Sequence, residues 1–218
     1  MGPKPLWRGE LHRIGALVYP VVGPATLCSA ASSSRALAHS LLFSAALEGI
    51  LVVSAILHTR DWTGREKALE RWRLADYSMI FIGIGLFYMS LGAQLMGGTR
   101  IFNLLIAPLV WTAAAVGVGG KILALNQPRW VEALAFLSQG YAWVLGYGVV
   151  KARLTPWEWS TLMGGGICIC AGVLAYVLQW PSYDWHRRRF QAHEAFHLGT
   201  IGMFGFFFLT MLSLVGRG

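Results

Sequence analysis

The sequence predicts an all-α membrane protein, a seven-transmembrane helix bundle with the N-terminus in the cytoplasm and the C-terminus outside. Three observations predict it: an apolar composition, seven apolar runs of membrane-spanning length, and an uneven distribution of basic residues between alternate loops. Of the 218 residues, 56% are hydrophobic and only 13% are charged. Soluble domains carry about a quarter charged residues, so this composition with its long uncharged runs points to a membrane protein.

Each apolar run is close to the ~20 residues that an α-helix needs to cross the hydrocarbon core. The first run contains Pro20 and Pro24, and the polar turn 32–35 separates it from the second. A charged loop, 59–73, precedes the third run. Shorter polar turns, at 97–100 and 126–129, bound the fourth.

The sixth run carries Gly164-Gly165-Gly166, which allows a neighbouring helix to approach closely, and the loop 181–190 precedes the last run. We expect spans over about 14–31, 36–57, 77–96, 101–120, 131–150, 160–180 and 192–215. The sequence shows no internal repeat or linker, which predicts one domain over residues 1–218.

The orientation follows from the basic residues, because cytoplasmic loops carry an excess of Lys and Arg. With seven spans, 13 of the 18 basic residues fall on the side of the N-terminus. These are Lys4, Arg8, Arg13, Arg60, Arg65, Lys67, Arg71, Arg73, Lys121, Arg129, Arg187, Arg188 and Arg189. The N-terminus is therefore predicted to be cytoplasmic, in the plasma membrane or an endomembrane.

The net charge of +8 follows these loops and does not gather in one basic tract, so the predicted partner is the lipid bilayer and not nucleic acid. Ten Trp and seven Tyr fit the aromatic belts of a membrane protein.

Four polar residues, His58, Asp76, His193 and His197, are predicted to meet at one depth. His193 and His197 open the last span and stand about 40° apart on one helix face, a spacing that suits two ligands of one metal ion. His58 ends the second span, with Ser54 one turn before it, and Asp76 immediately precedes the third span. In the predicted topology all of them lie near the cytoplasmic boundary, whereas His12, at the start of the first span, is expected to be interfacial.

Three imidazoles with one open position are typical of a catalytic zinc site. A carboxylate beside the open position can accept a proton from water that the metal makes acidic, and Asp76 is placed for that task. Ser54 can donate a hydrogen bond to Asp76, to an imidazole or to a substrate carbonyl. The alternative base is Glu194, because residues 193–197 also read His-Glu-x-x-His, the motif of zinc proteases.

These motifs resemble those of the haemolysin III / progestin and adipoQ receptor (PAQR) family, which belongs to a superfamily that includes the alkaline ceramidases. The matching segments are Ser54–His58, Leu74–Phe81 and His193–His197. The resemblance implies a seven-helix fold in which His58, His193 and His197 bind zinc and Asp76 and Ser54 lie beside the metal. Bacterial members usually have a second His after the Asp, where this chain has Tyr77.

The resemblance implies a zinc-dependent hydrolase that cleaves a lipid amide or ester, such as a ceramide-like substrate. Two alternatives belong to other classes: a receptor or haemolysin-type protein that does not hydrolyse its ligand, and an intramembrane protease that uses Glu194 as its base.

Overall fold

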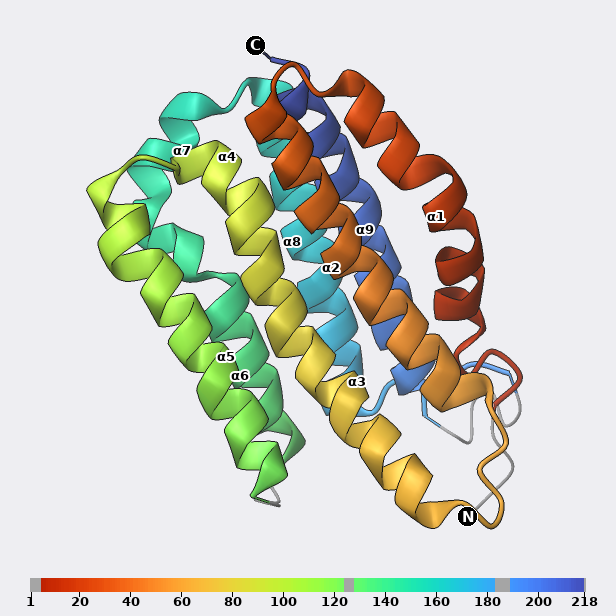
Figure 1. The fold of residues 1–218 in the computed structure, drawn as a ribbon. Coiled ribbons are helices and arrows are strands. Elements are labelled where there is room, and N and C mark those ends of the chain that lie inside the picture. Colours follow the sequence, from red (N-terminus) through yellow and green to blue (C-terminus); the bar gives the residue numbers. More distant parts are fainter. Residues whose placement is uncertain (1–4, 124–127, 183–188, 218) are drawn as a thin grey trace.

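The computed structural model describes residues 5–123, 128–182 and 189–217, and every regular element in that part of the chain is helical. Figure 1 shows the helices lying side by side in a bundle. The elements are α1 (Glu10–Ala30), α2 (Ser34–Thr59), α3 (Glu66–Phe87), a π-helical segment (Tyr88–Gly92), α4 (Ala93–Met96), a second π-helical segment (Phe102–Ile106), α5 (Ala107–Ile122), α6 (Arg129–Gly140), a 3₁₀ segment (Ala142–Gly146), α7 (Tyr147–Arg153), α8 (Pro156–Leu178) and α9 (Ala192–Val215).

Six helical stretches in the described residues are long and apolar enough to cross a membrane. They are Ser34–Thr59, Glu66–Met96, Phe102–Ile122, Arg129–Arg153, Pro156–Leu178 and Ala192–Val215, and each contains one of the predicted spans two to seven or most of it. The first predicted span, 14–31, forms helix α1 but is not among the six. Glu10 and Arg13 make the start of α1 polar, and Pro20 and Pro24 lie inside the helix.

The third predicted span begins eleven residues earlier than expected, because α3 starts at Glu66. Hydropathy marks only the apolar part of a helix, whereas residues 66–73 are charged but rich in good helix formers. Asp76 therefore lies inside α3 and does not open it.

The fifth predicted span is not one continuous helix, because a 3₁₀ segment separates α6 from α7. The Tyr88 side chain crosses to this break: its hydroxyl donates to the Gly140 carbonyl (2.9 Å) and accepts from the Trp143 amide (2.8 Å). A break inside a membrane needs such partners for the freed backbone groups.

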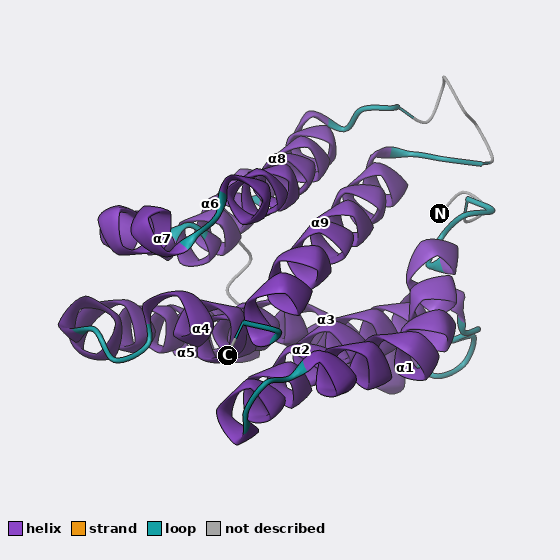
Figure 2. Cartoon of the chain, turned by 90° about the horizontal axis from the view of Figure 1, so that it is seen from above, coloured by secondary structure: helices purple, strands orange, loops and turns teal. Residues whose placement is uncertain are grey.

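Two helix pairs set the frame for the site. α8 packs along α9, with a backbone crossing at Gly172 and Gly199: a Cβ on Gly199 would lie 2.8 Å from the Gly172 Cα. α1 packs along α2, with α3 on the other side of α2, and Figure 2 shows α9 between α8 and the α1–α2 pair. The start of α1, the end of α2 and the start of α9 lie at the same end of the molecule (Figure 1).

At the opposite end, the buried Glu158 holds the end of α9 against the start of α8. Its carboxylate accepts a hydrogen bond from Ser213 (2.7 Å) and pairs with Arg217 (2.9 Å). The Thr155 backbone and side chain also donate to it, each at 2.8 Å. The far ends of α8 and α9 are thus fixed to each other.

Candidate metal centre

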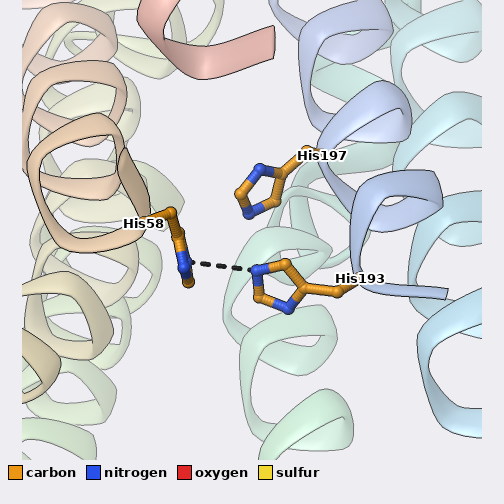
Figure 3. A group of neighbouring side chains, drawn as sticks. All are labelled: His58, His193 and His197. Carbon is orange, nitrogen blue, oxygen red and sulfur yellow. Dashed lines mark hydrogen bonds between the residues drawn. The ribbon is translucent and has the colours of Figure 1, made fainter. Parts of the chain in front are cut away.

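Three of the predicted site residues, His58, His193 and His197, form a compact group that we call the histidine triad. One ring nitrogen from each lies within 4.8 Å of the others. The Nε2 atoms of His58 and His193 are 3.1 Å apart. Figure 3 shows the rings converging from α2 and α9.

Local folding explains this convergence. His58 stands in the last turn of α2, and His193 and His197 occupy the first two turns of α9, one turn apart on the same face. The ends of these helices meet at one level of the bundle, so residues 135 positions apart in the sequence become neighbours. Imidazole nitrogens are ordinary ligands of zinc and related ions, and three of them leave a position for a further ligand. The triad can therefore hold a metal ion.

The Asp76 carboxylate reaches the triad from α3: its Oδ2 atom lies 3.8 Å from His58 Nε2. Ser54, one turn before His58, is buried and lines the same cavity as Asp76. The side chains of His58 and Asp76 are only 14% and 23% exposed. A carboxylate so placed can accept a proton from a group beside the triad.

Glu194 turns away from the triad. Its side chain is fully buried and pairs with Arg8, and its other oxygen accepts a hydrogen bond from the Gln191 amide (2.9 Å) in a capping box at the start of α9. Both oxygens therefore have partners that fix the N-terminal turn and the start of α9. Glu194 is also absent from the lining of the cavity described below.

Two further residues, Arg8 and His12, belong to this region, although neither is predicted as a site residue from the sequence. His12 is 2% exposed and is therefore buried among the helices beside the triad. Its ring stacks on that of His197 with centroids 3.9 Å apart and an angle of 3° between the planes. No hydrophobic period or motif singles out either residue in the sequence, because their partners lie on α9, more than 180 positions away.

The N-terminal turn before α1 covers the triad. Gly9 adopts φ +79°, and a Cβ there would lie 2.6 Å from the Cβ of His58. The Trp7 amide donates to the Arg189 carbonyl at 3.2 Å. These contacts, with the Arg8–Glu194 pair, place α1 against both helices that carry the triad.

A cavity of about 590 Å³ extends from the triad into the bundle. Along α3 and its continuation the lining runs from Arg73 to Met96, roughly 35 Å at the usual helical rise. Its polar end is lined by His12, Ser54, Arg73, Asp76, Tyr77, Glu132, Tyr176, His193 and His197. The remaining walls are mainly apolar and include Leu91, Phe136, Leu162 and Phe204.

Comparison with known proteins identifies relatives over most of the chain. The family model described as "Haemolysin-III related" matches residues 3–208. The "Hemolysin-3 homolog" of Bacillus subtilis (strain 168) is 24% identical over 194 residues, which cover 89% of this chain and 83% of the relative.

Proposed function

From the membership of this chain in the haemolysin-III related family, and from the geometry of its histidine triad, we infer that this integral, multi-pass membrane protein is a zinc-dependent hydrolase of a lipid amide or ester. The observation that carries the proposal is the set of three imidazole nitrogens within 4.8 Å of one another, with a carboxylate beside them. His58, His193 and His197 would hold the ion. When bound, zinc would supply the positive charge that polarises a scissile carbonyl and makes water acidic near neutral pH.

Asp76 is proposed as the general base. Its carboxylate lies beside the triad and faces the cavity, where it would take the proton of the attacking water and return it to the leaving amine or alcohol. Ser54 would hold that carboxylate in place through its hydroxyl. The buried pair with Arg8 argues against Glu194 as the base, and so against the protease alternative.

The cavity supports a lipid substrate of the ceramide type. Its volume of about 590 Å³ falls within the usual range for ligand sites, and its polar end coincides with the triad. An acyl chain would occupy the apolar length of the cavity while its amide or ester carbonyl reached the triad. The enclosing helices would limit the access of bulk water to the reacting bond.

We also propose that α1 is a seventh span within a single domain and that the triad lies at the cytoplasmic side. α1 runs along α2 toward the opposite end of the bundle, as the spanning helices do (Figure 1). Most basic residues fall on the side of the triad, which favours a cytoplasmic location. Single cysteines at Arg65 and Arg100, in a background without native cysteines, should react from opposite sides with a membrane-impermeant maleimide.

Metal analysis of the detergent-purified protein tests the first step. We expect about one zinc per chain in the wild type and almost none in His193→Ala. His39→Ala is a matched control, because His39 lies on α2 outside the cavity lining. Wild-type protein that binds no zinc, or a His193→Ala variant that retains it, would contradict the proposal.

Hydrolysis of short-chain fluorescent ceramides and esters in mixed micelles tests the second step. Asp76→Asn should keep the zinc and lose at least a hundredfold in activity, the lower range for a general base. A zinc-loaded wild type that cleaves neither class of lipid would refute hydrolysis while leaving the metal centre in place.

A further inference from the structure

The second nitrogen of His197 lacks the partner that orients most metal-binding histidines. A ligating imidazole commonly donates its other N–H to a carboxylate, carbonyl or water, which fixes the tautomer and the ring orientation. The Nδ1 atom of His197 is buried and has no hydrogen-bond partner among the described residues. The orientation of this ring must therefore come from packing.

His12 supplies that packing. The two rings are parallel within 3°, with their centroids 3.9 Å apart, so the face of one imidazole covers the face of the other. Neither nitrogen of His12 has a hydrogen-bond partner in the part of the chain that the structure describes. The ring face is consequently the part of His12 that makes a specific contact with the triad.

The position of His12 is fixed independently of this stack. One turn earlier, Gly9 sits against the Cβ of His58, and Arg8 pairs with Glu194 on α9, three residues before His197. The start of α1 is thus held to both helices that carry the triad. A ring mounted on this turn can hold His197 at a set angle relative to His58.

We propose that His12 is a positioning residue of the metal centre, which holds the His197 ring in its coordinating orientation by stacking on it. The inference rests on the proposed metal binding by the triad. It assigns to α1 a part in metal affinity although α1 contributes no ligand.

The test compares three variants in the full-length protein: His12→Phe keeps an aromatic face, His12→Leu keeps bulk without that face, and His12→Ala removes both. Zn²⁺ affinity is measured by competition with a chromogenic chelator, and the visible spectrum of bound Co²⁺ reports on coordination geometry. We expect His12→Ala and His12→Leu to bind Zn²⁺ about 10- to 100-fold more weakly, as on loss of an orienting partner, with altered Co²⁺ bands. The Zn²⁺ affinity of His12→Phe should stay within about threefold of the wild-type value, because its ring can still orient His197; loss of that orientation would weaken binding by about 10-fold or more.

Elution as a single species and the thermal midpoint of the metal-free protein show whether each variant folds. If His12→Ala fails to fold, His12→Leu decides the test, because it fills the same space. Wild-type Zn²⁺ affinity in His12→Leu would overturn this inference and leave the proposed metal centre in place. Equal losses in His12→Phe and His12→Leu would assign the effect to the ring nitrogens and also overturn it. A wild type that binds neither ion would overturn it together with the proposed function.

Discussion

Substitution of Glu194 separates the two acids that the sequence offers as catalytic bases. In Glu194→Gln the side-chain oxygen can still accept a hydrogen bond from the backbone N–H of Gln191, whose nitrogen lies 2.9 Å from a carboxylate oxygen in the wild type. The substitution removes the negative charge that faces Arg8. Since Glu194 is not in the cavity lining and Asp76 is, we expect zinc content and hydrolysis to remain near wild-type values.

The expected loss is in stability. A hydrogen bond to a charged group is worth about 1.5–3 kcal/mol, and the Arg8 side chain, 23% exposed, can regain part of its hydration. We therefore expect a loss of about 2 kcal/mol. At roughly 2–4 °C per kcal/mol for a chain of this size, the thermal midpoint would fall by about 4–8 °C.

A double-mutant cycle with Arg8→Gln measures the pair itself. The two single variants should each lose stability, and the double variant should lose less than their sum, because the second substitution removes a side chain that has already lost its partner. Thermal unfolding in detergent and hydrolysis are measured on the same samples. Folded, zinc-loaded Glu194→Gln without activity would refute the assignment of Asp76 as the base, and additive losses would refute the ion pair.

Three further substitutions, one of them a control, test the two ends of the bundle. Gly9→Ala should lower the thermal midpoint and weaken zinc binding, because it places a side chain on a left-handed backbone with its Cβ 2.6 Å from that of His58. Gly64→Ala is the control: its φ is +70° and nothing lies within 4 Å of the added Cβ. It should lose only the backbone strain energy of about 1–2 kcal/mol and keep its zinc affinity. Equal zinc affinities in these two variants would show that the N-terminal turn does not set the position of His58. Glu158→Gln should lower the free energy of unfolding by only about 1 kcal/mol, because its partner Arg217 is 42% exposed, and should leave zinc binding unchanged. Thermal unfolding and chelator competition measure the two effects. Altered zinc binding would contradict the independence of the two ends of the bundle.

Hydropathy predicted seven spans, and six of them match helical stretches long and apolar enough to cross a membrane, because a long apolar run has few alternatives to a membrane helix. It placed the start of α3 too late, since charged helix formers continue a helix without adding to its apolar signal. The break between α6 and α7 could not be predicted, because it depends on the Tyr88 hydroxyl from another helix. The triple glycine of α8 indicated close packing, but there Gly164 and Gly165 face the rings of Phe206 and Phe207, and the close backbone crossing is at Gly172.

The candidate site divides along the same physical line. Depth in the bundle can be derived from sequence, because successive helices alternate in direction; this brought His58, Asp76, His193 and His197 to one level. The position of a helix around the bundle axis cannot be derived in this way, because hydropathy does not say which helices are neighbours. Asp76 and Glu194 stand at the same depth and both adjoin a histidine, yet one faces His58 across 3.8 Å and the other pairs with Arg8. α1 and the turn before it separate these roles: Arg8, in that turn, pairs with Glu194, and His12, in the first turn of α1, stacks on His197. The placement of both depends on contacts with residues more than 180 positions away.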